Sequence, residues 1–262
     1  MFMNIVLGCL LQFVAVMAAI AVGQRLGRDA RAAEPESFDK GYGAVEGAVF
    51  ALLGLVIAFT FSGAAARFDA RRSLVLQEAN AIGTAYLRVD LLPVDRQPAV
   101  RDLFRRYADA RIAAYVDLPS IEESDARAQR ANTIQAELWR VSIAALATLP
   151  PTPIHQLVVT SLNDMIDVTS TRYLAARTHP PLAVWLLMGL LSVVAALLAG
   201  YDFGGAGGRR RLHGVLFATV MAGSTYVILD MEYPRFGLIR VDDADAVLRQ
   251  TRDSMGMPNT PP

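Results

Sequence analysis

Residues 47–72 read GAVFALLGLVIAFTFSGAAARFDARR, and the character of this stretch changes at Arg67. No residue from Gly47 to Ala66 is charged, and this run is long enough to cross the hydrocarbon core of a bilayer, which needs about 20 residues of helix. After Arg67 the charges follow closely on one another. The pattern therefore predicts a helix that spans a membrane and leaves it at Arg67.

The chain as a whole is more apolar than a soluble protein. Of its 262 residues 53% are hydrophobic and 19% charged, whereas about a quarter of the residues in a soluble domain are charged. Its long uncharged runs are apolar on all sides and not along one stripe, which favours membrane spans over the buried helices of a soluble core. We expect four spans, at about residues 4–23, 45–66, 182–201 and 212–230.

The region between the second and third spans has a different pattern. Apolar residues recur there at helical spacing along one face at a time, for example at Ile134, Leu138, Val141 and Ala145. Prolines separate these segments, as expected at helix boundaries. The pattern predicts a small helical bundle whose first helix continues the second span.

These features predict an all-α polytopic membrane protein with four transmembrane helices and an inserted helical bundle between the second and third. The expected parts are a first transmembrane helix pair at 1–66, the bundle at 67–180, a second transmembrane pair at 181–231 and a C-terminal tail at 232–262. Asp242, Asp243 and Asp245 favour the start of a short helix in that tail, because acidic groups interact favourably with a helix N-terminus.

Residues that carry enzyme chemistry are sparse. The histidines His155, His179 and His213 are far apart, and the single cysteine, Cys9, excludes a cysteine-based zinc site. The sequence contains no nucleophile elbow and no phosphate-binding loop. With 25 basic and 25 acidic residues the net charge is zero, which argues against nucleic acid as a partner. We therefore expect no enzyme activity, no metal site and no cofactor.

Two segments resemble a known family. The second span is followed by FDARRSLVLQEANAIGTAYLRVDLLP at residues 68–93, and the fourth ends in VILDMEYPRFGLIRV at residues 227–241. Their most specific parts are residues 78–88 and 230–240. With the order of two spans, an insert and two further spans, the chain resembles the bacterial membrane proteins that have a bestrophin-like domain of unknown function.

This resemblance implies an oligomeric ion channel, because bestrophins are pentameric anion channels. It places the protein in a membrane, with the bacterial inner membrane expected, and makes lipids and further copies of the chain its partners. Small residues on the second span also suit packing around a symmetry axis. The alternative is a membrane-anchored interaction or sensing module whose helical bundle binds a ligand or a protein partner, neither of which the residues identify.

Four residues of the second span are candidates for a pore or its mouth. Glu46 stands where the span enters the membrane, and an ionisable group there is either functional or simply interfacial. Phe50, Phe59 and Phe61 would form a hydrophobic constriction that gates by dewetting. The alternative for these rings is contact with lipid or with neighbouring spans.

Two groups of charged and polar residues are further candidates. The first would form an interfacial network that either fastens the fourth span to the root of the bundle or acts as a selectivity ring. It consists of Arg67, Arg71, Arg72, Asp230, Glu232 and Arg235. The second would form either a polar network within the bundle or the lining of a vestibule. It consists of Glu78, Asn80, Arg88, Asp164 and Asp167.

The basic residues of the short loops predict an orientation in the membrane. The positive-inside rule places the basic loops that join paired spans in the cytoplasm, and hence the bundle outside it. The resemblance implies the opposite, since bestrophins keep their insert in the cytoplasm. The loop residues that carry the prediction are Arg25, Arg28, Arg31 and Lys40 in one loop and Arg209, Arg210 and Arg211 in the other.

We predict from the loop charges that the bundle is extracytoplasmic. Reporters fused at Ser124 check this, because alkaline phosphatase is active only outside the cytoplasm and green fluorescent protein only inside it. The phosphatase fusion should be active and the fluorescent fusion dark. Fluorescence with an inactive phosphatase would place the bundle in the cytoplasm.

Overall fold

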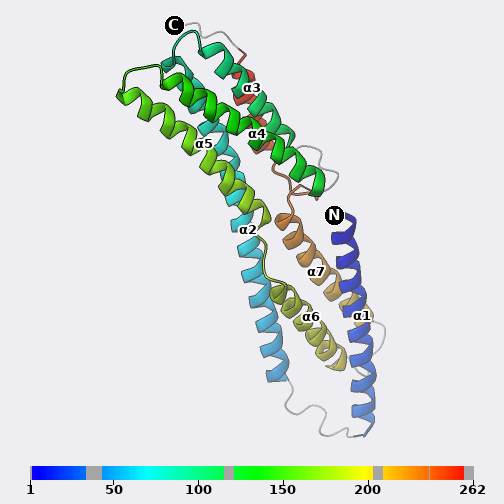
Figure 1. Ribbon diagram of the computed structural model, residues 1–262. Helices are drawn as coiled ribbons and strands as arrows, with labels where there is room; N and C mark the ends of the chain where they lie inside the picture. Colours follow the sequence, from blue (N-terminus) through cyan, green and yellow to red (C-terminus); the bar gives the residue numbers. More distant parts are fainter. Residues whose placement is uncertain (1, 34–42, 115–120, 203–208, 236, 257–262) are drawn as a thin grey trace. The chain divides into compact units, whose positions relative to one another are not determined.

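A computed structural model describes residues 2–33, 43–114, 121–202, 209–235 and 237–256 (Figure 1). It confirms the predicted all-α fold. Lys40 and the glycine-rich segment 203–208 lie outside the described residues. The elements are α1 (Phe2–Ala33), α2 (Gly43–Leu87), the 3₁₀ helix η1 (Arg88–Leu91), α3 (Gln97–Ala113), α4 (Ile121–Leu146), α5 (Pro153–Arg177), α6 (Leu182–Asp202), α7 (Arg209–Glu232) and α8 (Asp242–Ser254).

Four helical segments are long and apolar enough to cross a membrane, as the sequence predicts. By length and composition these candidate spans lie within Met3–Ala33, Gly43–Leu91, Pro153–Asp202 and Leu212–Glu232. The second extends well beyond Ala66 because α2 is a single helix of 45 residues. The span and the first helix of the inserted region are thus one element.

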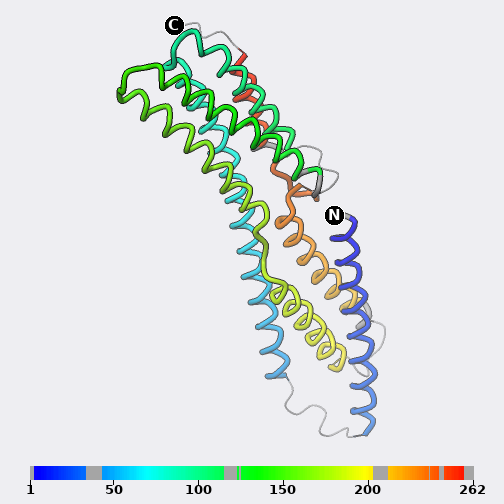
Figure 2. Tube along the Cα trace, in the orientation of Figure 1, coloured from blue at the N-terminus to red at the C-terminus, as the bar shows by residue number. Residues whose placement is uncertain are grey.

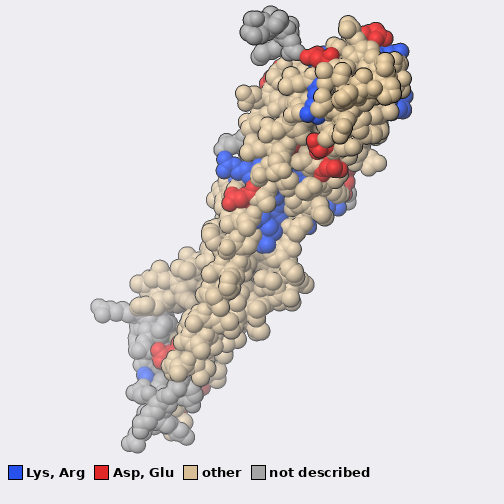
Figure 3. All heavy atoms as spheres, turned by 90° about the vertical axis from the view of Figure 1, so that its left-hand side faces the viewer, with Lys and Arg blue, Asp and Glu red and all other residues tan. Residues whose placement is uncertain are grey.

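The chain divides into two compact units. The first unit comprises Met1–Phe68 and His179–Arg240, and the second comprises Asp69–Thr178 and Val241–Pro262. On the face shown in Figure 3, charged side chains gather over the helices of the second unit, and the described surface of the first is almost uncharged. This distribution fits a first unit that faces lipid and a second unit that faces water.

Helix α1 packs along α6 and α7 in the first unit (Figure 2). Its buried side chains are medium-sized or small, and they meet small residues on the two partner helices. The resulting cluster consists of Val16, Ala19, Ile20, Ala196 and Ala218. Small residues at helix contacts are typical of membrane spans, because they let the backbones approach closely.

Three glycines bring the α1 and α6 backbones into direct contact. A Cβ atom on Gly23 would lie 2.1 Å from the carbonyl oxygen of Leu197, and one on Gly27 would lie 2.0 Å from that of Tyr201. From the facing helix, a Cβ atom on Gly200 would lie 2.3 Å from the carbonyl oxygen of Ile20. Only glycine fits at these positions.

The first part of α2 packs one face into the same unit. Leu53 is buried against Leu191 and Met221, which lie on α6 and α7. Farther along α2, Ala64 is buried against Met188 and Ile228. This face therefore contributes to the core of the first unit.

A conventional hydrophobic core holds the second unit together. The apolar faces expected between the second and third spans are buried or half-buried in it, with Phe104, Leu138 and Met165 at its centre. Helix α8 adds Leu248 to this core. The C-terminal tail expected from the sequence thus forms a helix that packs within the second unit.

Hydrogen bonds and ion pairs join α8 to its neighbours in this unit. The Tyr86 hydroxyl donates to the carbonyl oxygen of Met255 at 2.8 Å. The Arg252 guanidinium binds both carboxylate oxygens of Asp109, at 2.7 and 3.0 Å. Such two-pronged pairing is among the stronger ion-pair geometries.

We predict that Gly23→Ala and Gly200→Ala each destabilise the protein by about 1–3 kcal/mol, because the added methyl group forces two backbones apart. Thermal unfolding in detergent measures the effect. Gly8→Ala on the same helix α1 is the matched control, since no atom lies within 4 Å of a Cβ there. Equal melting temperatures for Gly23→Ala and Gly8→Ala would contradict this close packing.

Candidate functional site

The four candidates on α2 do not share one environment. Glu46 lies in the first turn of the helix and is half-buried. Phe50 is also half-buried and meets the Phe217 ring edge-on, with 5.9 Å between ring centroids. Phe59 and Phe61 are 70% and 44% exposed. Only these last two point away from the packing of the first unit.

The exposed face of α2 is rich in small residues. Besides the large side chains Leu55 and Phe59, it presents residues that would let another helix approach closely. These small exposed residues are Ala44, Ala48, Ala51, Ala58 and Ser62. The only charged residue on α2 before Arg67 is Glu46.

At the other end of this span, Glu232 is a buried carboxylate with two partners. Its side chain is 0% exposed, and Arg67 Nε donates to Oε1 at 2.7 Å. The Nδ1 atom of His179 lies 3.4 Å from Oε2, and the His179 ring stacks on Tyr233 with 4.5 Å between centroids. Glu232, at the end of α7, therefore connects α2 with His179, which lies just before α6.

Asp230 has a different role, although it lies only two residues away. Its carboxylate accepts the backbone N–H groups of Leu238, at 3.0 and 3.1 Å, and of Ile239, at 2.8 Å. The turn comes so close that a Cβ atom on Gly237 would lie 1.2 Å from Asp230 Oδ1. Asp230 thus fastens the segment after α7 onto the end of that helix.

The six residues of the expected interfacial network divide between the two units. Arg67 pairs with Glu232, whereas Arg71 is buried in the second unit and donates to the carbonyl oxygens of Ala175, at 3.1 Å, and Thr178, at 2.8 Å. Arg72 is exposed on α2, and Arg235 is half-buried just after α7. Asp230 and Glu232 are two residues apart on α7 and point to different sides of that helix. Arg67 and Arg71 are four residues apart on α2, so they lie on the same side of it and meet different partners.

The buried charges of the second unit centre on Glu78, whose side chain is 0% exposed. One carboxylate oxygen accepts Arg111 Nε at 2.5 Å, and the other accepts an N–H group of Arg172. Arg172 also reaches Asp245 on α8, at 3.2 Å. This cluster, which we term the Glu78 network, joins α2, α3, α5 and α8.

The pKa of Glu78 is lowered, although burial by itself would raise it. The charges of Arg111 and Arg172, together with their hydrogen bonds, outweigh the loss of hydration. Glu78 lies beyond the uncharged run of α2, which ends at Ala66. The carboxylate is therefore ionised at neutral pH, and with Asp245 it compensates the two buried guanidinium groups.

Most residues of the expected bundle network do not belong to the buried Glu78 network. Asn80, Asp164 and Asp167 are exposed, and Arg88 donates to the carbonyl oxygen of Leu157 at 2.5 Å. Only Glu78 joins a buried cluster, and its partners are arginines and not the acidic residues of α5. Asp164 and Asp167 lie on the solvent side because the apolar stripe of α5 points inward.

The sequence did carry a signal for the missing partners. Arg111 follows Phe104 and Tyr107 at helical spacing, and Arg172 follows Met165 and Thr169 in the same way. A charged residue in line with an apolar stripe predicts a buried charge that needs a partner. That signal identifies the arginines, but it does not say which carboxylate they meet.

Comparison with known proteins gives a consistent result. The bestrophin-like domain family matches residues 4–246. The chain belongs to the bestrophin-like family. No curated protein matches it significantly. The predicted resemblance is therefore confirmed at the level of the family.

Solved structures agree with this assignment. A variant of a bacterial bestrophin homologue from Klebsiella pneumoniae, with a tryptophan-to-alanine mutation, has a TM-score of 0.69 at 14% identity and covers 94% of this chain and 97% of its own. A tyrosine-to-alanine variant of such a homologue has a TM-score of 0.62 at 15% identity, over 92% and 98% of the two chains. At this identity the likeness concerns the fold: this is a multi-pass, bestrophin-like membrane protein.

The described residues contain no group of three or more His, Cys, Asp or Glu side chains that would hold a metal ion. Acidic side chains at the centre of the two units are instead matched with arginines or backbone N–H groups. Glu78, Glu232 and Asp230 illustrate this arrangement.

We predict that Glu78→Gln destabilises the protein by about 3–5 kcal/mol, because it removes the negative charge that two buried guanidinium groups share and leaves Asp245 as the carboxylate paired with Arg172. The same argument predicts an effect of pH. The lowered pKa makes this stabilisation complete above the ordinary glutamate pKa of about 4.3, and it is lost as pH falls through the folded-state value. Unfolding between pH 7 and pH 3 measures both.

Asp164→Asn is the matched control for Glu78→Gln, because it removes an exposed carboxylate from the same unit. It should change the melting temperature little, and its pH profile should follow the wild type. The difference in stability between wild type and Glu78→Gln should shrink in acid. A difference that stays constant down to pH 3 would show that the charge of Glu78 is not what stabilises the unit.

Proposed function

We propose that this protein is an oligomeric ion channel whose conduction path runs along the exposed face of α2. The observation that carries the proposal is the exposure of Phe59 on a span whose opposite face is packed into the core of its own chain. Phe61 is exposed on the other flank of the packed face, because residues two apart on a helix point about 200° apart. Membership of the bestrophin-like family supports it. The proposed path would be narrow and apolar where these rings lie, and such constrictions gate by dewetting.

The same geometry argues for an assembly of several chains. One face of α2 is filled by contacts of Leu53 and Ala64 within the first unit, so a single chain offers only the opposite face to a path. Copies arranged around an axis would bring these exposed faces together. The exposed alanines of α2 would allow the helices to approach one another.

The same proposal includes the type of ion, the membrane and the orientation of the protein in it. Anion selectivity rests on the bestrophin relationship, since the face of α2 between Glu46 and Arg67 carries no charge that would choose between signs. We infer a bacterial inner membrane, with the bundle on the extracytoplasmic side as the loop charges predict. The alternative, a membrane-anchored interaction or sensing module, is supported by a groove in the second unit that is described below.

Flux measurements on purified protein in liposomes test the channel. We predict chloride efflux from liposomes that contain the wild type and faster efflux with Phe59→Ala or Phe61→Ala, because a smaller side chain widens and wets the constriction. Leu186→Ala is the control, since Leu186 is 64% exposed but lies on α6. It should leave the efflux unchanged.

Two results would contradict the proposal. If Leu186→Ala raised efflux as much as Phe59→Ala, the path would not follow α2. If neither the wild type nor any variant conducted ions, the spans would serve as an anchor and the module alternative would stand.

A further inference from the structure

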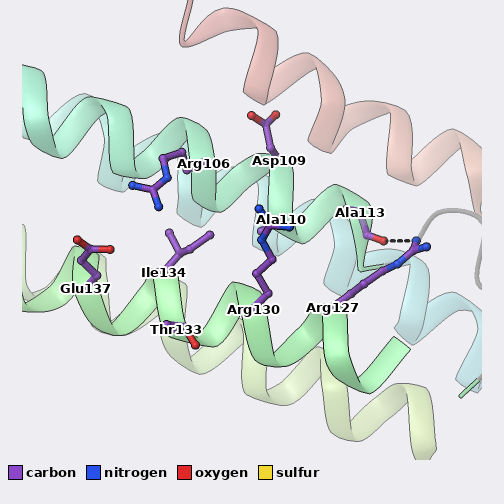
Figure 4. Close-up of a pocket in the computed structure, with 9 residues that line it drawn as sticks. All are labelled: Arg106, Asp109, Ala110, Ala113, Arg127, Arg130, Thr133, Ile134 and Glu137. Carbon is purple, nitrogen blue, oxygen red and sulfur yellow. Dashed lines mark hydrogen bonds between the residues drawn. The ribbon is translucent and has the colours of Figure 1, made fainter. Parts of the chain in front are cut away.

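The second unit contains a groove between α3 and α4, with a volume of about 620 Å³ (Figure 4). This volume is within the range of small-molecule sites, which is about 300–1,000 Å³. Ala110 and Ala113 on α3 leave the space open, and Thr133 adds a hydroxyl group from α4. The groove is therefore large enough for a ligand and has polar groups on its walls.

Two arginines enter this groove from opposite walls. Figure 4 shows Arg106 of α3 and Arg130 of α4 directed into the space between the helices. Both side chains are exposed, and neither forms an ion pair with any residue that the structure describes. Two unpaired positive charges in one groove repel each other, and an anion between them removes that repulsion.

Two of the acidic residues nearby already have other partners. Asp109, which lines the groove, is directed away from it and binds Arg252 through both oxygens. The side chain of Glu123 pairs with Arg127, a third arginine on the wall. Among the described residues, Glu137 is therefore the acidic side chain of the groove that has no partner of its own, and it forms no ion pair with Arg106 or Arg130.

Glu137 limits the kind of anion that fits. It lines the same groove, about two turns of α4 beyond Arg130, and it would repel a second negative group at that end. The groove therefore suits a ligand with one anionic group and a neutral remainder. The neutral part would lie toward Ile134, which is the apolar side chain of the wall.

The position of the two arginines on different walls of the groove favours phosphate over carboxylate. A guanidinium group binds either anion with two parallel hydrogen bonds. A carboxylate presents both oxygens on one side, whereas a tetrahedral phosphate presents oxygens in several directions and can bridge groups on opposite walls. We propose that the groove between α3 and α4 binds the phosphate group of a small phosphomonoester or of a lipid headgroup, held between Arg106 and Arg130. The site is distinct from the conduction path and does not depend on whether the spans conduct ions.

Binding to the full-length protein in detergent tests this site. The free-ligand arm titrates glycerol phosphate by calorimetry, and the lipid arm counts bound phosphatidic acid against phosphatidylcholine by native mass spectrometry. The groove variant is Arg106→Gln with Arg130→Gln. The control is Arg140→Gln with Arg249→Gln, which removes two exposed arginines of the same unit that do not line the groove.

We expect the groove variant to weaken binding in one arm by roughly tenfold or more, since each charged hydrogen bond contributes that much, and the control to bind as the wild type does. Loss of glycerol phosphate binding would identify a soluble phosphomonoester. Loss of selective phosphatidic acid binding alone would identify a lipid headgroup. The proposal is overturned if wild type, groove variant and control bind both probes equally, or if the wild type binds neither. Unchanged melting temperatures for both double variants establish that the fold is intact, since all four arginines are exposed.

Discussion

Helix α2 is one continuous helix with an apolar part suited to lipid and an amphipathic part suited to water, and the rest of the structure depends on this constraint. Its hydrogen bonds are internal, so the apolar part can cross lipid without leaving peptide groups unsatisfied. Beyond Ala66 the same helix becomes amphipathic and carries Glu78 into the core of the second unit. Part of α2 contributes to the core of each unit, with α6 and α7 beside it in the first and α3, α5 and α8 among its neighbours in the second.

The two units solve the packing problem by different physical means. Association of helices in lipid gains little from the hydrophobic effect, because lipid tails are as apolar as the side chains. The first unit accordingly relies on close backbone contact at Gly23, Gly27 and Gly200. The second unit faces water and buries a large hydrophobic core, so it can include a buried ion cluster at Glu78. Glycines thus allow the helices of the first unit to pack closely, and paired charges join the helices of the second unit.

The charged residues divide into those that the fold uses and those that it leaves available. Glu232, Asp230 and Glu78 are buried and fully engaged, and they connect segments that are far apart in the chain. Arg106 and Arg130 share a groove with Glu137, and neither arginine forms an ion pair with a described residue. A buried pair therefore marks where the helices are fastened, whereas facing unpaired arginines mark a place for a ligand. In a family related to channels, this separates a binding surface in the second unit from the spans.

The sequence by itself determined the helices, the four spans and the family. Span length, helical periodicity and proline positions are local properties, and they do not require knowledge of what a helix touches. The motifs at 78–88 and 230–240 correctly pointed to the bestrophin-like family. Sequence also named Asp230 and Glu232 as candidates for an interfacial charge network and Glu78 as a candidate for a polar network in the bundle.

Only the tertiary structure decided the partners of those groups. Glu78 meets Arg111 and Arg172 and not Asp164, and Asp230 meets backbone N–H groups while Glu232 takes Arg67. Likewise, helix geometry places Phe50 and Phe59 on opposite sides of α2, but the wholly apolar pattern does not say which side is packed. The physical reason is that a partner is chosen by the rotation and position of helices distant in the chain. Those are set by packing over whole helix faces, which local spacing does not encode.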